Sequence, residues 1–77
     1  MRYNTKHIAY YGLTDRERQI LLLLANGESN AQIGEALGIR MTTVKSVVNR
    51  LRKSFVVFDR ISLITTALKM GLLELEK

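Results

Sequence analysis

The stretch that decides the fold of this chain is SNAQIGEALGIRMTTVKSVVNRLRKSF, residues 29–55. Ser29 is a favoured N-cap residue, and the apolar spacing after it predicts a short helix through about Leu37. Gly38 supplies the permissive backbone that a tight turn needs. A longer amphipathic helix is predicted from about residue 42 to 54. Its apolar face consists of Val44, Val47, Val48, Leu51 and Phe55. Two such helices joined by a tight turn predict a helix-turn-helix motif.

Gly34 lies inside the short predicted helix. Glycine costs about 1 kcal/mol relative to alanine in a helix interior, so its presence calls for a structural reason. We expect a neighbouring helix to approach the backbone closely at this position.

A further helix is predicted on the N-terminal side of the motif. Thr14 is followed three residues later by Glu17, which is the spacing of a capping box, and Gly27 ends the leucine-rich run that follows. The ordered domain is therefore expected over residues 13–77. Residues 1–12 are expected to form an N-terminal arm or a short extra helix.

On the C-terminal side, Phe55–Phe58 breaks the helical period and is expected to be a buried connection. Asp59 can cap a fourth helix, about Arg60–Met70, which Gly71 ends. Three leucines remain as an apolar tail: Leu72, Leu73 and Leu75. The sequence thus predicts an all-α domain of four helices.

Composition excludes several classes of function. The 77 residues make one small domain, and without cysteine it has neither a disulfide nor a cysteine-based metal site. The single histidine cannot supply a cluster of metal ligands. We find no nucleophile–base arrangement and no glycine-rich phosphate loop, so we expect no enzyme activity, no cofactor and no small-molecule ligand. No apolar run approaches the length of a membrane span and no signal peptide is evident, so a cytoplasmic location is expected.

The distribution of charge points to a polyanion as partner. The formal net charge is +5, and no acidic residue lies between Glu35 and Asp59. Five cations lie in that interval: Arg40, Lys45, Arg50, Arg52 and Lys53. Such a cluster is either a solvated face or a nucleic-acid-binding surface.

Three runs of residues carry a resemblance to a known family: LTDRERQILLLLANGESNAQIGEALGI, TTVKSVVNRLRKSF and VFDR. Over Leu13 to about Leu73 the chain resembles the helix-turn-helix DNA-binding domain of the LuxR/FixJ family, including its free-standing GerE-like members. The resemblance implies a four-helix domain whose third helix enters the major groove and whose fourth helix dimerises. The implied dimerisation residues are Ile61, Ile64 and Leu68. Glu17 and Arg60 match strongly patterned family positions, and we expect capping or an internal salt bridge from them rather than a role in binding.

The positions that match the base-reading residues of the family are Lys45, Ser46 and Asn49. Lys45 and Asn49 are one helical turn apart, about 6 Å along the axis, so they can reach neighbouring base pairs. Lysine can donate to guanine O6 or N7, and asparagine can pair bidentately with adenine. Candidate phosphate contacts are Ser29, Asn30, Arg40, Thr42, Thr43, Arg50, Arg52 and Lys53.

The sequence also departs from the family pattern. Arg40 stands where the family has a serine at the start of the recognition helix, so either Thr42 supplies the cap or the register shifts. Val47 replaces a histidine and Arg50 an asparagine.

The leading hypothesis is a sequence-specific transcription regulator that binds double-stranded DNA as a homodimer, with RNA polymerase as a candidate second partner and no role at a membrane. Two alternatives stay open. The chain could be a helix-turn-helix interaction protein that pairs with a larger regulator and antagonises it, or the output domain of a longer response regulator.

Overall fold

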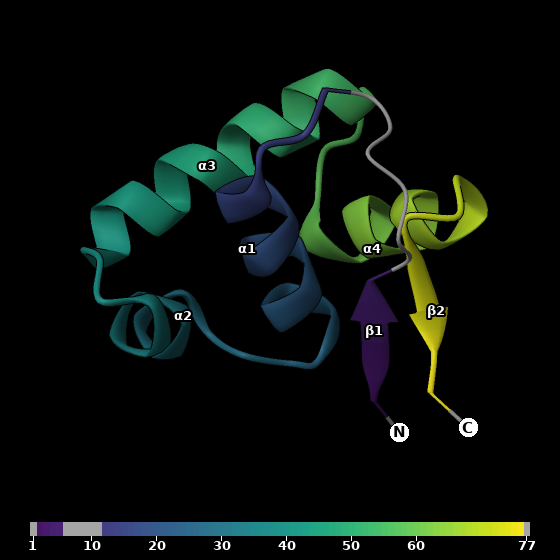
Figure 1. Ribbon diagram of the computed structural model, residues 1–77. Coiled ribbons are helices and arrows are strands. Elements are labelled where there is room, and N and C mark those ends of the chain that lie inside the picture. The colour runs from purple at the N-terminus through teal and green to yellow at the C-terminus, as the bar shows by residue number, and fades with distance from the viewer. Residues whose placement is uncertain (1, 6–11, 77) are drawn as a thin grey trace.

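Four helices account for most of the described chain, residues 2–5 and 12–76, in the computed structural model (Figure 1). The elements in chain order are β1 (Tyr3–Thr5), α1 (Asp15–Ala25), α2 (Asn30–Leu37), α3 (Met41–Phe55), α4 (Arg60–Lys69) and β2 (Leu73–Leu75). The predicted four-helix fold is confirmed.

Capping boxes define where the first two helices begin. The hydroxyl of Thr14 accepts from the Glu17 amide at 3.0 Å, and Glu17 Oε1 accepts from the Thr14 amide at 2.8 Å. Ser29 and Gln32 form the same reciprocal pair at the start of α2. Each box satisfies two backbone donors that a helix start leaves unpaired, which confirms the predicted caps at Thr14 and Ser29.

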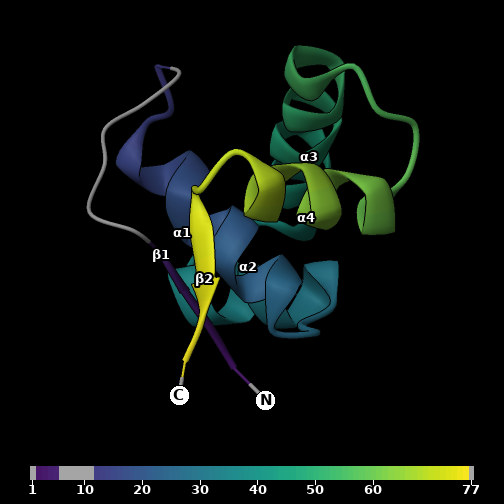
Figure 2. The ribbon, with the colours of Figure 1, turned by 90° about the vertical axis from the view of Figure 1, so that its right-hand side faces the viewer.

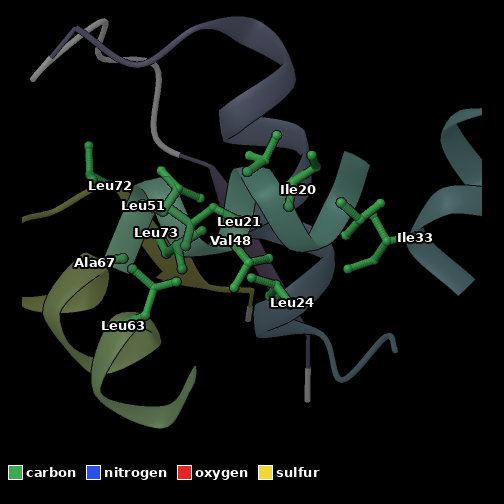
Figure 3. Packing of buried hydrophobic residues seen from close by; sticks show 12 residues of the cluster. Ile20, Leu21, Leu24, Ile33, Val48, Leu51, Leu63, Ala67, Leu72 and Leu73 are labelled. Carbon is green, nitrogen blue, oxygen red and sulfur yellow. The ribbon is translucent and has the colours of Figure 1, made fainter. Parts of the chain in front are cut away.

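The core lies where α1, α3 and α4 meet and includes Ile33 of α2 and Leu73 of β2; the stick view shows the apolar side chains of these elements pointing toward one another (Figure 3). The buried apolar residues are Ile20, Leu21, Leu24, Ile33, Val44, Val47, Val48, Leu51, Leu63, Ala67, Leu72 and Leu73. Each fully buried leucine or isoleucine contributes about 1.5–3 kcal/mol relative to an exposed one. The predicted apolar face of α3 is buried at Val44, Val47, Val48 and Leu51.

Gly34 sets the spacing between α2 and α3. A Cβ atom at this position would lie 2.8 Å from the Ile39 carbonyl oxygen and 3.3 Å from the Met41 nitrogen. Close approach was expected, and the neighbour is the backbone of the turn and the first residue of α3. Gly38 ends α2 in the left-handed conformation, with φ of 67°, and so turns the chain toward α3.

The connection between α3 and α4 is more exposed than predicted. The side chains of Val56 and Phe58 are 83% and 90% exposed, and Val57 between them packs against the core. Val56 ends α3 in the left-handed conformation, with φ of 57°. This turn sends alternate side chains outward, so the expectation of a buried connection is wrong for Val56 and Phe58.

The ends of the described chain meet in a small sheet that the sequence did not predict. Strand β1 pairs antiparallel with β2, with Tyr3 opposite Leu75 (Figure 2). The side chain of Asn26, at the end of α1, accepts from the Tyr3 amide at 2.6 Å and donates to the Tyr3 carbonyl at 3.1 Å. Part of the expected apolar tail is therefore a strand, and Tyr3–Thr5 is not a helix; most of the expected arm lies outside the described residues.

Candidate nucleic-acid interface

The predicted base-reading residues lie together on the solvent-exposed side of α3. Lys45, Ser46 and Asn49 are all exposed, while the opposite side of the helix is buried in the core. Lys53 continues this exposed side toward the C-terminal end. The helix therefore offers a polar, cationic face that its own domain leaves uncovered.

A surface hollow of about 320 Å³ joins α3 to the starts of α2 and α4. The residues that line it are Asn30, Lys45, Val48, Asn49, Arg52 and Arg60. Three of these carry positive charge and none is acidic, so the hollow favours an anionic ligand such as a phosphate. It thereby brings Asn30, a predicted phosphate contact from α2, beside two of the predicted base readers.

Arg60 holds the start of α4 against the loop between α1 and α2. Its Nη1 donates to the Glu28 carbonyl at 3.2 Å, and its Nη2 donates to Asn30 Oδ1 at 2.8 Å. The expectation that Arg60 is structural is confirmed by these contacts, although its partners are a carbonyl and an amide instead of a carboxylate. Because Asn30 Oδ1 accepts from Arg60, its Nδ2 is the group that can donate to a phosphate.

The start of α3 is not capped by a side chain. Arg40 occupies the N-cap position in an extended conformation, and the helix begins at Met41. The amides of Thr43 and Val44 both donate to the Arg40 carbonyl. Neither a cap from Thr42 nor a register shift occurs, so that expectation is wrong: the backbone closes the first turn by itself. Thr42 and Thr43 are exposed at the positive end of the helix dipole.

Arg50 faces α1 and contacts Glu17. Its Nη1 lies 3.5 Å from Glu17 Oε2, and the two side chains are 63% and 11% exposed. The other carboxylate oxygen of Glu17 belongs to the capping box with Thr14. Glu17 therefore serves both capping and an internal ion pair, as expected, and it offsets part of the charge that Arg50 could bring to a phosphate.

Arg52 is bound within the chain in a way that sequence reasoning missed. Its Nη1 donates to the Phe58 carbonyl at 2.7 Å, and its Nη2 donates to Asn49 Oδ1. Its Nε is buried and has no hydrogen-bond partner among the described residues. The spacing of Asn49 and Arg52, three residues apart on a helix, is the signal that could have indicated the contact.

Asp59 begins α4 beside this arginine. Its carboxylate accepts from the Ser62 amide at 2.7 Å, and this backbone hydrogen bond is the main reason that the pKa of Asp59 is lowered. The Ser62 side chain and the positive charge of Arg52 lower the pKa further. The predicted cap at Asp59 is confirmed.

The residues that the resemblance assigns to dimerisation differ in their exposure. Ile61 is 77% exposed, whereas Ile64 and Leu68 are half-buried and pack against the core of their own domain. Ile61 lies three residues after Phe58, which is also exposed, and of the three residues it is the one whose side chain its own domain leaves uncovered.

Other kinds of site find no support in the described part of the chain. Within residues 2–5 and 12–76, no three histidine, cysteine, aspartate or glutamate side chains gather in a way that could hold a metal ion. None of the helices there combines the length and the hydropathy needed to cross a bilayer.

Comparison with known proteins places the chain among regulators. Residues 11–67 match the family described as bacterial regulatory proteins, luxR family. The chain is 43% identical over 63 residues to the uncharacterized transcriptional regulatory protein YhcZ of Bacillus subtilis, covering 82% of this chain and 29% of that protein. It is 38% identical over 65 residues to the response regulator protein VraR of Staphylococcus aureus, covering 84% and 31%. The chain thus spans less than a third of the length of these relatives.

Solved structures show the same fold. The VqmA dimer of Vibrio cholerae, in the absence of target DNA, superposes with a TM-score of 0.75 at 35% identity, covering 78% of this chain and 27% of that one. The VqmA–ligand–DNA complex superposes with a TM-score of 0.76 at 33% identity, covering 82% and 28%.

Proposed function

This chain belongs to the luxR family of bacterial regulatory proteins, and from this premise we propose that it reads the major groove of DNA with α3, as a dimer. The family consists of DNA-binding transcription regulators and is not a class of enzymes. The observation that supports the proposal best is the exposed side of α3, where Lys45, Ser46 and Asn49 lie together. No acidic residue occurs anywhere in α3 to repel a phosphate backbone.

We call the exposed side of α3 that carries Lys45, Ser46 and Asn49 its reading side. The residues on it and around it are assigned either to bases or to phosphates. We assign the bases to Lys45, Ser46 and Asn49, because they lie on the side of the helix that a groove would receive. Phosphate contacts are assigned to residues at the starts of α2 and α3 and to the cation Lys53 near the end of α3. These residues are Ser29, Asn30, Arg40, Thr42, Thr43 and Lys53. Arg50 and Arg52 already have partners within the chain, so they contribute less than their charge alone suggests.

Dimerisation is proposed through α4, with Ile61 as the contact that its own domain leaves open. The half-buried Ile64 and Leu68 lie one and two turns further along the same helix. A two-fold dimer would contact half-sites about one helical turn of DNA apart. RNA polymerase is a further partner that such a regulator would engage.

Selection from a random duplex library tests this function. The wild-type protein should enrich an inverted repeat, and the Lys45→Ala/Asn49→Ala variant should bind it at least about 30-fold more weakly, since it loses two base contacts worth about 1–3 kcal/mol each. Arg16→Ala is the matched control, because it removes an exposed cation of α1 that belongs neither to the exposed side of α3 nor to the proposed dimerisation helix. Full affinity of the double variant would refute the assignment of the reading side.

A second candidate function rests on the exposed apolar side chains of Val56, Phe58 and Ile61. These side chains lie in one short stretch that joins α3 to the first turn of α4, and an exposed apolar patch is typical of a protein-binding surface, so this domain could instead pair with a larger regulator and antagonise it. Folded wild-type protein that binds no duplex at low salt, yet forms a mixed dimer with a longer family member, would favour this candidate. The DNA-reading role of α3 would be unchanged if the domain were the output part of a longer response regulator.

A further inference from the structure

The guanidinium group of Arg52 connects the reading side of α3 to the loop that follows it. One of its nitrogens, Nη1, donates to the Phe58 carbonyl at 2.7 Å, and another, Nη2, donates to Asn49 Oδ1. The third, Nε, is buried. A charged group held at two points by directional bonds has little freedom to swing toward a phosphate.

This contact determines which way the side-chain amide of Asn49 faces. An arginine has five N–H donors and no acceptor, so only the oxygen of the amide can face it. Asn49 Oδ1 therefore points along the helix toward Arg52, and Asn49 Nδ2 is the end of the amide that remains for DNA. We propose that Arg52 is a positioning residue which makes Asn49 a hydrogen-bond donor, so that Asn49 reads guanine in preference to adenine.

The chemistry of the base edges gives the reason. Adenine is recognised by an asparagine that accepts from N6–H with its oxygen and donates to N7 with its nitrogen at the same time. With Oδ1 turned along the helix toward Arg52, the amide does not hold its oxygen and nitrogen side by side toward one base edge, as the adenine contact requires. Guanine offers two acceptors, O6 and N7, and Nδ2 can donate to either of them without any help from Oδ1. This base preference replaces the adenine contact that the sequence alone suggests.

A comparison with Ser46 shows the effect of the hydrogen bond between Arg52 and the Phe58 carbonyl. The Ser46 hydroxyl donates to the Thr42 carbonyl at 3.1 Å, but a hydroxyl rotates freely and can exchange this exposed bond for one to a base. Arg52 cannot rotate in the same way without abandoning the Phe58 carbonyl. The orientation of Asn49 is therefore supported by a partner that has a second anchor of its own, whereas that of Ser46 is not.

This inference rests on the proposed function, and a selection experiment with three variants tests it. Asn49→Ala identifies the operator position that Asn49 reads, and the wild-type protein should favour guanine over adenine there by about tenfold. Arg52→Met keeps an unbranched, flexible stem and removes all donors, so it frees Asn49 Oδ1. We expect that variant to accept adenine, with the guanine-to-adenine ratio falling by about tenfold.

Lys53→Met is the matched control, since it removes one positive charge from the next residue of α3, which is exposed. It should weaken binding on all sequences, reduce the slope of log affinity against log salt by about 0.9, and leave the base ratio unchanged. If Arg52→Met behaves in this same way, Arg52 contacts a phosphate and the inference is overturned. An adenine at the position read by wild-type Asn49 would overturn it equally.

Circular dichroism will show whether Arg52→Met is folded. If it is not, Asn49→Asp provides the test, because its carboxylate keeps the contact with Arg52 but has no hydrogen to donate. That variant should lose the guanine preference, and keeping it would overturn the inference. A wild-type protein that selects no sequence at all would instead refute the proposed function, and with it the basis of this inference.

Discussion

Replacing Val56 by glycine is expected to stabilise the domain, although it removes a side chain. Val56 ends α3 with φ of 57° and ψ of 49°, in the left-handed region. Among the described residues it is the one non-glycine residue with positive φ. A Cβ atom crowds the following carbonyl in this conformation, and a β-branched side chain is especially disfavoured there.

The expected change in the free energy of unfolding of Val56→Gly is the sum of three contributions. Relief of the left-handed conformation is worth about 1–2 kcal/mol. The side chain is 83% exposed, so the small apolar area that it buries is worth only about 0.3 kcal/mol. Glycine also has more freedom in the unfolded chain, which costs about 0.5–1 kcal/mol. The net gain is about 0.5 kcal/mol, which corresponds to a rise in Tm of about 2–4 °C for a domain of this size.

Thermal and urea unfolding of Val56→Gly and Val56→Ala measure this difference. Alanine removes the exposed methyl groups and the strain of the β-branch but keeps the Cβ atom, so it is the control for the Cβ atom itself, and its stability should lie between those of the wild type and the glycine variant. The hydrogen bonds that end α3, from the Val56 amide to Lys53 and from the Val57 amide to Arg52, involve only the backbone and so remain available in all three proteins. A glycine variant no more stable than the alanine variant would refute the reasoning.

Two further predictions concern the start of α4. Arg60→Ala should lower the free energy of unfolding by about 2 kcal/mol, because it leaves the Glu28 carbonyl and the Asn30 amide without their donor. Arg60→Lys should recover less than half of this loss, since an ammonium group lacks the planar fork that holds both partners. An unchanged urea midpoint in Arg60→Ala would contradict the structural role of Arg60. Asp59→Asn concerns pH. The hydrogen bond from Ser62 lowers the pKa of Asp59 in the folded state, so its contribution to stability is present at neutral pH and is lost as the pH falls below about 4. Asparagine keeps the cap but does not titrate, so the variant should lose less stability than the wild type between about pH 6 and pH 3 in thermal melts. Parallel pH profiles would contradict the assignment.

Local signals in the sequence predicted the helices well. The Thr14–Glu17 pair needs only residues three positions apart, and the side of α3 that is buried follows from the spacing of its valines. Such features are settled within a few residues, so a sequence displays them directly. The exposed side of α3, with Lys45 and Asn49 one turn apart, followed from the same spacing.

The errors have a common physical origin. Whether Val56 and Phe58 are buried depends on the left-handed turn at the end of α3, and a valine gives no sign of such a turn. The strands Tyr3–Thr5 and Leu73–Leu75 are three residues each, too short for an alternating pattern, and their pairing joins opposite ends of the chain. Likewise, α3 begins after Arg40 without a side-chain cap, so no cap residue in the sequence indicates where this helix starts. Its start lies in the turn whose backbone packs closely against Gly34.

The sequence by itself determined the four helices, the side of α3 that faces solvent and the residues available there to meet DNA, because helical periodicity and cap chemistry are local. Only the tertiary structure decided which charges and hydrogen-bonding groups of those residues remain available to DNA. Arg50 and Arg52 carry the same charge as Lys53, yet Glu17 and the Phe58 carbonyl already engage them. The amide of Asn49 can present either end to a base, and a contact with Arg52, itself anchored on the next loop, selects its nitrogen.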